Sequence, residues 1–361
     1  MIDTLSNEQL ELIPVIRDRW LSQLYDLKDV DKESCIEGVK WLYNASGLDE
    51  PEVRFCKSIN EAQRIIHERK YGDAASTTKL VPEALCSYGD ISDHGWVAFY
   101  DYFTELGILN EPSFNSFKKL LQSNYFTMIQ MSDVCYVVEN PIYLKLVGPD
   151  NILSSVDGYA IEFKDGTGVY FVNGVYLDDS IYRKLANKLY TMDDFSAERN
   201  EETKAACLEF YRQKFGDEYA FNFIRENLKE VDEYIDKKPE IYMKGTTNSD
   251  RIGVYTLFAG TISNGVKVAY VRCYDASSDR IFFLSVDPNK VTTAKDAVPS
   301  LYRVPRILEP HILSINRQGE RYSTNFTAKG KELLNTISED EVKDLVDLSG
   351  DRYYDLIRYE Y

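Results

Sequence analysis

Residues 156–177 read VDGYAIEFKDGTGVYFVNGVYL, and this stretch decides how the middle of the chain folds. Two runs within it, 159–163 and 168–172, are rich in the β-branched and aromatic residues that favour strands. Asp165-Gly166 separates the two runs, and Asn173-Gly174 follows the second. Asp-Gly and Asn-Gly are typical of tight hairpin turns, because these residue types tolerate a positive φ. The stretch therefore predicts a three-stranded meander, with its third strand directly after the second turn.

Three functional interpretations of the same stretch fail on spacing. Aspartic proteases have Asp, Thr and Gly in succession, whereas Gly166 separates Asp165 from Thr167 here. A dinucleotide-binding fingerprint needs a glycine where this chain has Phe171, and it needs a helix to begin there. Asp157 and Asp165 lack the spacing of a calcium-binding EF-hand loop. Turn chemistry explains the glycines without a ligand.

Upstream of this stretch, the first 125 residues show the periodicity of helices. Ser6 and Gln9 have the spacing of a capping box, and apolar residues then recur at helical intervals as far as Leu24. Pro14 lies inside that pattern, and we expect it to kink or divide the helix. Further helical patterns lie at about 32–46, 58–72, 96–106 and 114–121. These patterns predict a helical N-terminal region, residues 1–125.

Downstream of residue 125, the pattern changes to strands with inserted helices. Strand-like runs dominate to residue 177, and a helical section follows to about residue 227. Further strands are expected at 241–244, 253–259, 267–274 and 280–286, the last two as a hairpin. The predicted class is α+β, with a helical N-terminal part followed by an antiparallel β-rich part with inserted helices. We assign residues 126–320 to this α+β region, which contains the meander at 157–177.

The composition argues against two classes of partner. The 361-residue chain has 59 acidic and 42 basic residues and a formal net charge of −17. Nucleic-acid binding depends on cations that displace counterions, so we expect no nucleic-acid partner. No apolar run approaches the length of a membrane span, and the N-terminus lacks the basic start and apolar run of a signal peptide. We therefore expect a cytoplasmic protein with no membrane partner.

The residue types that carry most catalysis and metal binding are scattered. No two of the six cysteines form a CxxC pair, and we expect them to be small buried hydrophobes. Three histidines lie far apart, and His67, in the charged run IIHERK, is expected to be exposed. Pairing of His94 with Cys35, Cys56 or Cys86 as base and nucleophile is an open alternative that rests on chance proximity. The sequence predicts no cofactor, no metal and no catalytic residue by number.

The run from 157 to 174 resembles the signature "D-G-P-A-aliphatic-x-Y-x-D-G-x-x-x-Y-x-x-x-G" of a bacterial and phage-associated domain family of unknown function. The matching positions are Asp157, Gly158, Ala160, Asp165, Gly166, Tyr170 and Gly174. The segments LSNEQLELIPVIRDRW, WLYNASGLDEP and GWVAFYDYFTELGI are similar to the same family, and weaker likeness extends to about residue 300. Ser154 stands where the family has histidine, and Tyr159 where it has proline. The resemblance implies a fold and a phage association, but no reaction.

Two hypotheses about function follow. The first is a non-enzymatic interaction or structural protein, encoded by a phage and forming a component of a larger particle, in the host cytoplasm or the virion. Its support is the 27 tyrosines, which suit surfaces that become buried in a protein complex. The same tyrosines would also be explained by half-buried positions in β-structure. The alternative function is a carboxylate-dependent hydrolase acting on a carbohydrate or nucleotide.

Residues 321–361 form a C-terminal acidic, Tyr-rich extension. Its last part, DRYYDLIRYEY, interleaves charged and aromatic residues too evenly for a solvated tail. We expect this part to dock, either on its own domain or on a protein partner, through Tyr353, Tyr354, Tyr359 and Tyr361. Leu345, Val346 and Leu348 predict a helical apolar face just before it.

Overall fold

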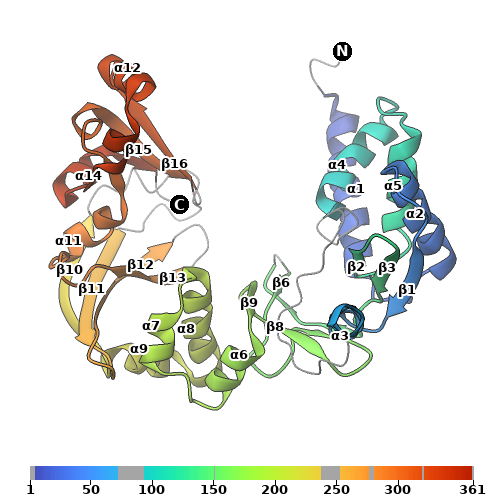
Figure 1. The fold of residues 1–361 in the computed structure, drawn as a ribbon, viewed down its shortest axis with the longest axis horizontal. Helices are drawn as coiled ribbons and strands as arrows, with labels where there is room; N and C mark the ends of the chain where they lie inside the picture. The colour runs from blue at the N-terminus through green and yellow to red at the C-terminus, as the bar shows by residue number, and fades with distance from the viewer. Residues whose placement is uncertain are drawn as a thin grey trace. The chain divides into compact units, whose positions relative to one another are not determined.

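The computed structural model describes residues 5–71, 93–149, 151–236, 253–275, 280–318 and 321–359 (Figure 1). Its contacts divide the chain into two compact units, Met1–Phe171 and Val172–Tyr361, which we describe separately. Helices concentrate in the first part of the chain, and most paired strands are antiparallel. The α+β class predicted from the sequence is confirmed.

The helices of unit 1 follow the predicted patterns closely. They are α1 (Asn7–Leu24), α2 (Lys32–Ala45), α3 (Ile59–Tyr71), α4 (His94–Glu105) and α5 (Pro112–Leu121). Ser6 and Gln9 form the predicted capping box at the start of α1. The helix runs through Pro14 without division, so the predicted break is not observed.

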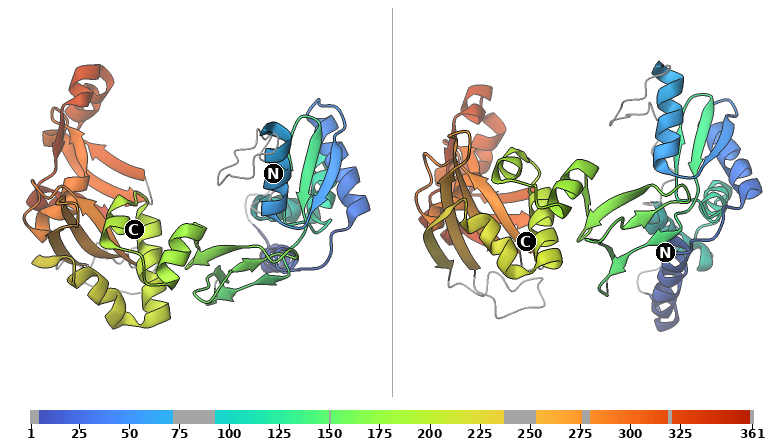
Figure 2. Two further views of the ribbon diagram at one scale, coloured as in Figure 1. Left: turned by 60° about the horizontal axis from the view of Figure 1, so that its bottom comes forward. Right: turned by 90° about the horizontal axis from the view of Figure 1, so that it is seen from below.

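Unit 1 also contains a sheet in strand order β1-β3-β2, of which β2 and β3 lie in the strand-like region predicted from residue 125 and β1 was not predicted. Its strands are β1 (Glu52–Cys56), β2 (Thr127–Gln130) and β3 (Val134–Val138). Every residue of β3 is buried, because alternate side chains enter two cores on opposite faces of the sheet. Helix α3 lies on one face and α2 on the other (Figure 2).

This sheet explains why unit 1 does not end at residue 125. Strand β1, from the region predicted to be helical, pairs in parallel with β3, from beyond that boundary. Both strands contribute to the same two cores, so residues 1–125 do not form a separate domain. The division falls at 171/172 instead.

The 156–177 stretch forms the predicted meander as part of a four-stranded sheet, in order β4-β7-β8-β9. Its strands are β4 (Tyr143–Leu144), β7 (Ile161–Glu162), β8 (Gly168–Val172) and β9 (Val175–Leu177). A further two-stranded sheet joins β5 (Leu146–Val147) to β6 (Ile152–Leu153). At the second turn of the meander, Asn173 and Gly174 have φ values of 49° and 78°, as a type I′ turn requires.

Unit 2 is built on an antiparallel sheet in order β10-β11-β12-β13. The strands are β10 (Lys229–Asp236), β11 (Gly253–Thr261), β12 (Lys267–Asp275) and β13 (Arg280–Val286). The predicted hairpin is confirmed by the β12–β13 pairing, whereas β10 was not predicted and the expected strand at 241–244 lies outside the described residues. Four helices precede the sheet: α6 (Asp179–Ala186), α7 (Met192–Ala197), α8 (Glu201–Phe215) and α9 (Asp217–Arg225).

The other face of this sheet packs against C-terminal elements, and alternate strand residues such as Leu257 and Val271 fill that core. In chain order, the C-terminal elements of unit 2 are α11 (Ala294–Ala297), η2 (Pro299–Leu301), β14 (Arg303–Pro305), η3 (Glu309–His311), β15 (Ile312–Gln318), β16 (Arg321–Phe326), α12 (Ala328–Thr336), α13 (Glu339–Lys343), β17 (Leu345–Asp347), α14 (Gly350–Leu356) and β18 (Ile357–Tyr359), and not all of them contribute to that core.

The C-terminal extension is thus an integral part of unit 2, because β17 pairs with β14 and β18 pairs with β15. These pairings cross the predicted 320/321 boundary. The helical face predicted from Leu345, Val346 and Leu348 is wrong, since residues 345–347 form strand β17.

Candidate functional site

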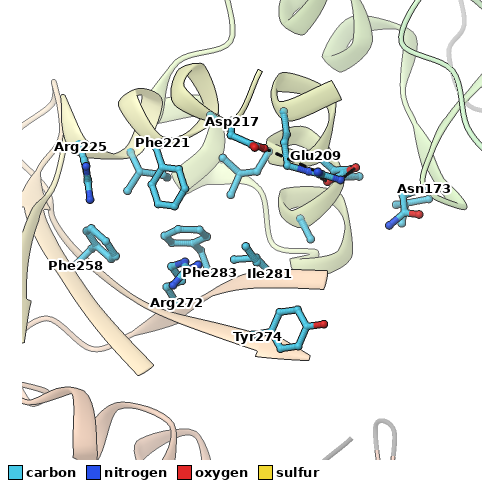
Figure 3. Close-up of a pocket in the computed structure, with 17 residues that line it drawn as sticks. Asn173, Glu209, Asp217, Phe221, Arg225, Phe258, Arg272, Tyr274, Ile281 and Phe283 are labelled. Carbon is cyan, nitrogen blue, oxygen red and sulfur yellow. Dashed lines mark hydrogen bonds and ion pairs between the residues drawn. The ribbon is translucent and has the colours of Figure 1, made fainter. Parts of the chain in front are cut away.

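A mainly apolar cavity of about 370 Å³ lies in unit 2, between helices α8 and α9 and the β11–β13 face of the sheet (Figure 3). We call it the unit 2 cavity. Its helical wall is formed by Ala205, Ala206, Leu208, Glu209, Arg212, Asp217, Ala220, Phe221, Ile224 and Arg225. Its sheet wall and one edge are formed by Phe258, Arg272, Tyr274, Ile281, Phe283, Asn173 and Val175.

Strand alternation and register assemble the sheet wall. Arg272 on β12 lies opposite Phe283 on β13, and Tyr274 lies opposite Ile281. Residues two apart on a strand share a face, so these side chains all face the helices. On the helical wall, small side chains such as Ala220 leave the space that larger residues would fill. The floor is closed by the buried rings of Phe258 and Phe283, whose centroids lie 5.8 Å apart.

The charged residues of the unit 2 cavity fall into two groups. Arg212 pairs with Glu209 at 2.6 Å and approaches Asp217 at 3.9 Å. Arg225 and Arg272 instead lie beside the ring of Phe221, at 5.3 and 5.7 Å from its centroid. Neither of these two arginines forms an ion pair with any residue that the structure describes. The carboxylates of the cavity therefore share one cationic partner, Arg212, whereas the other two arginines both lie beside one aromatic ring.

The hairpin residues singled out from the sequence serve the architecture of unit 1. Ser58 caps α3 by accepting from the backbone N–H of Glu61 at 2.9 Å, and it donates to Asp165 Oδ2 at 2.6 Å. Thr167 donates to Asp165 through its backbone N–H at 3.0 Å and its hydroxyl at 2.7 Å. Burial alone would raise the pKa of Asp165, but the bonds from Ser58 and Thr167 outweigh it and lower that pKa. Asp165 thus connects the meander to α3.

The other signature positions have turn or packing roles along the meander. Gly158, Gly166 and Gly174 have positive φ, Ala160 is fully buried, and Tyr170 packs against Tyr159 with ring centroids 4.6 Å apart. Asp157 is exposed and lies 3.9 Å from Lys145.

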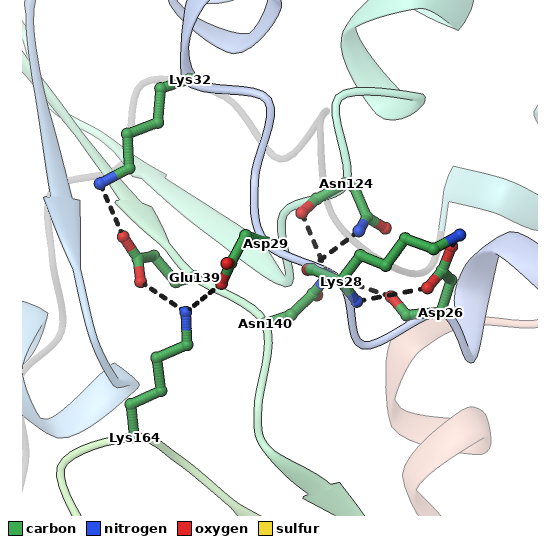
Figure 4. A network of polar contacts seen from close by, with 8 residues as sticks. All are labelled: Asp26, Lys28, Asp29, Lys32, Asn124, Glu139, Asn140 and Lys164. Carbon is green, nitrogen blue, oxygen red and sulfur yellow. Dashed lines mark hydrogen bonds and ion pairs between the residues drawn. The ribbon is translucent and has the colours of Figure 1, made fainter.

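A polar network ties the loop after α1 to the end of β3 (Figure 4). Glu139 accepts from Lys32 at 2.9 Å and from Lys164 at 3.1 Å, and Lys164 also pairs with Asp29 at 2.6 Å. Asn140 donates to the carbonyl oxygens of Asp26, Lys28 and Asn124 at 3.0–3.2 Å. Burial would raise the pKa of Glu139, but the two lysines lower it. Each group has a structural partner, which explains the network without a ligand.

Two buried charges have comparable structural roles. Asp101, fully buried in unit 1, accepts from the indole N–H of Trp20 at 2.9 Å and pairs with Lys118. Lys204, 2% exposed in unit 2, donates to Glu201 at 3.1 Å and to Ser285 at 2.9 Å. A charged group is costly to bury unless it is paired and hydrogen-bonded, and these contacts meet that requirement for Asp101 and Lys204.

The cysteines behave mostly as predicted. Cys35, Cys56, Cys135 and Cys207 are buried, Cys273 is partly buried, and Cys86 lies outside the described residues. Burial raises the pKa of Cys35 and of Cys56 to about 11, which disfavours the nucleophilic thiolate.

The expectation for His67 is wrong, since its side chain is only 6% exposed despite the charged residues around it. His94 is also buried, with its ring 5.5 Å from that of Trp20.

Among the described residues, twelve tyrosines are buried in the cores. The largest fully buried side chains include Tyr43, Tyr136, Tyr211, Tyr270 and Tyr353.

In the C-terminal segment, Tyr353 and Tyr354 are 0% and 3% exposed, and they belong to the core of unit 2. The Tyr353 hydroxyl donates to that of Tyr302 at 3.2 Å. The backbone of Tyr359 pairs with that of Asn316, and Tyr361 lies outside the described residues. This part of the chain docks on its own unit.

Within the described ranges, no cluster of three or more histidine, cysteine or carboxylate side chains is placed to hold a metal ion. None of the described helices is long and apolar enough to cross a membrane.

Comparison with family models, with curated proteins and with solved structures finds no match to this chain. The resemblance of the 157–174 signature to a phage-associated family therefore stays a prediction. The unit 2 cavity was missed by the sequence analysis, because its residues come from segments as far apart as Asn173 and Phe283. No short motif marks them.

Proposed function

We propose that the protein is a non-enzymatic binding protein and that the unit 2 cavity is its ligand-binding site. The observation that carries this proposal is a 370 Å³ cavity with a floor of buried phenylalanines and a mainly apolar lining that also contains a limited set of polar and charged side chains. Small-molecule sites are typically apolar concavities of roughly 300–1,000 Å³ with a few placed polar groups. The volume and lining of the unit 2 cavity both match that description.

The arrangement of carboxylates favours binding over hydrolysis. Glycoside hydrolysis needs two carboxylates on opposite sides of the bond that breaks, one of them able to donate a proton. The carboxylates at the unit 2 cavity, Glu209 and Asp217, lie 2.6 and 3.9 Å from the same guanidinium group, that of Arg212, and do not face each other across the cavity. This pairing supports binding rather than the carboxylate-dependent hydrolase.

The experiment that tests this proposal is fluorescence titration with phenyl naphthylamine, a neutral probe that becomes bright in apolar sites. We expect saturable binding to the wild-type protein and its loss in Ala220→Trp, which fills the cavity from α9. Ala328→Trp, an exposed position at the start of α12, is the matched control and should bind normally. Equal binding to all three proteins would contradict the proposal, provided that circular dichroism shows all three folded.

We also propose protein partners for unit 1, as expected of an interaction protein. Trp96, Phe99 and Tyr100 on α4 are 37%, 60% and 45% exposed, and their rings contact one another. Clustered exposed aromatic residues are typical of protein-binding surfaces. A photo-crosslinking residue placed at Phe99 in the native host should trap a defined partner, and the same residue at the exposed Arg64 of α3 should not. Identical crosslinks from both positions would contradict this proposal.

The same proposal includes the absence of a nucleic-acid partner, a location in the cytoplasm or virion, and a phage origin. The net charge of −17 supports the absence of a nucleic-acid partner, which filter binding at low salt would test. Cytoplasmic or virion location, and membership of a phage particle, would be tested by mass spectrometry of fractionated host cells and purified particles.

A further inference from the structure

We propose that the unit 2 cavity selects an amphipathic organic anion, a small molecule with an apolar body and one anionic head group. This inference rests on the proposed function and specifies the chemistry of its ligand. The body would lie against Phe258 and Phe283, and the head group would bind Arg225 and Arg272.

The two arginines come from different elements and lie near the same phenylalanine ring. Arg272 comes from the middle of β12, where its pairing with Phe283 places it beside the apolar floor. Arg225 comes from the last turn of α9. Both guanidinium groups lie within 6 Å of the Phe221 ring centroid, at 5.3 and 5.7 Å, so this ring has one cation near it from the helix and one from the sheet (Figure 3). An anionic head group placed beside the ring would be attracted by both cations.

Neither arginine has a counterion among the side chains that the structure describes. The chain carries 59 acidic residues against 42 basic ones, yet no described carboxylate pairs with either arginine. Glu209 and Asp217, the acidic residues of the same cavity, are directed to Arg212 instead. Two neighbouring cations repel each other, and a bound anion relieves that repulsion. Guanidinium groups bind carboxylates and related oxyanions with paired, charge-assisted hydrogen bonds.

The rest of the cavity lining is mainly apolar, and a bare inorganic anion would leave that space unfilled. Ile224 on α9 and Phe258 on β11 are 2% and 3% exposed, and Ala205 and Ala206 on α8 expose little polar surface. Burial of an apolar body there would contribute roughly 25 cal/mol for each Å² removed from water. A volume of 370 Å³ suits a single small molecule better than a folded partner, whose contact surface is far larger.

The test compares two probes of nearly identical shape. Anilinonaphthalene sulfonate carries an anionic group, and phenyl naphthylamine lacks it. We expect Arg272→Gln and Arg225→Gln each to weaken sulfonate binding by about tenfold, the size expected for one charge-assisted hydrogen bond. Binding of the neutral probe should be unchanged within about twofold, since the apolar lining is intact. Arg306→Gln, exposed and paired with Asp344 elsewhere in unit 2, controls for the change in net charge.

Competition identifies the head group and separates the two proposals. Decanoate and decyl phosphate should displace either probe from the wild-type protein more strongly than decanol, and this preference should decline as salt concentration rises. If the arginine variants bind the sulfonate as tightly as wild type, or decanol competes equally, the anion selectivity is wrong while the cavity stays a binding site. If Ala220→Trp leaves both probes bound, the probes occupy another surface and the proposed function itself fails. Displacement by an apolar peptide but not by the small acids would also overturn the inference.

Discussion

At the scale of single residues, turn conformations could be predicted from the sequence, but the burial of polar side chains could not. Asn173 and Gly174 adopt the positive φ that their types predicted, because a turn is determined by its own few residues. Lys204 sits in a helix where a lysine normally faces water, yet it bonds to Ser285, which is 81 positions away. His67, which was predicted to be exposed, is buried for the same kind of reason. The burial of a polar side chain depends on what packs over it, and no local pattern records that.

Gly166 tests the architectural interpretation of the first turn of the meander. Its φ is +77°, and a Cβ added there would meet no atom within 4 Å, so the cost of a side chain is backbone strain alone. We expect Gly166→Val to lower the free energy of unfolding by about 1–3 kcal/mol, because β-branched residues rarely adopt this conformation. Gly166→Asn should cost less, since asparagine tolerates it. Urea denaturation measures both, and a Val variant as stable as the Asn variant would contradict the explanation.

At the scale of elements, capped helices and hairpins were predicted well, and isolated strands were missed. The capping box at Ser6 and the hairpin of β12 with β13 both carry their signals within a few residues. Strand β1, EVRFC, is only five residues long, and strand β10, KEVDEYID, lacks strict alternation and contains an irregularity between Glu230 and Asp232. Each is a strand because a distant partner supplies its hydrogen bonds, so the tertiary context determines the element.

The link between the meander and α3 should depend on pH through Asp165. Its pKa is lowered in the folded protein, so its stabilising contribution is present above the unfolded pKa of about 4 and is lost as the pH falls through the lower folded value. Asp165→Asn should therefore reduce stability at pH near 7. The difference in free energy of unfolding between this variant and wild type should become smaller below pH about 4. Urea denaturation at pH values from about 7 to below 4 measures this difference. Asp157→Asn, at an exposed position in the same stretch, is the control. A gap that is constant with pH would contradict the role of the carboxylate.

At the scale of the whole molecule, the α+β fold class could be predicted from the sequence. The division of the chain into two units and the position of the candidate site could not. The α+β class follows from the types of elements present. The division at 171/172 follows from pairings such as β1 with β3 and β15 with β18, which join residues far apart in the chain. The unit 2 cavity depends on the same long-range order. Arg225 and Arg272 come from a helix and a strand that only the folded sheet brings to one phenylalanine.

The C-terminal segment provides the sharpest test at this scale. Deleting residues 350–361 removes the buried side chains of Tyr353, Tyr354 and Leu356, together with strand β18 beside β15. Loss of one large buried side chain typically costs about 3–5 kcal/mol, so the loss of three is comparable to the whole stability of a domain. We expect the truncated chain to lose hydrogen-exchange protection throughout unit 2 and to keep it in unit 1. Tyr353→Phe, which removes only the hydroxyl that bonds to Tyr302, should cost about 1 kcal/mol and preserve protection. If truncation left unit 2 protected but abolished a complex with another protein, the segment would serve a partner instead of its own core.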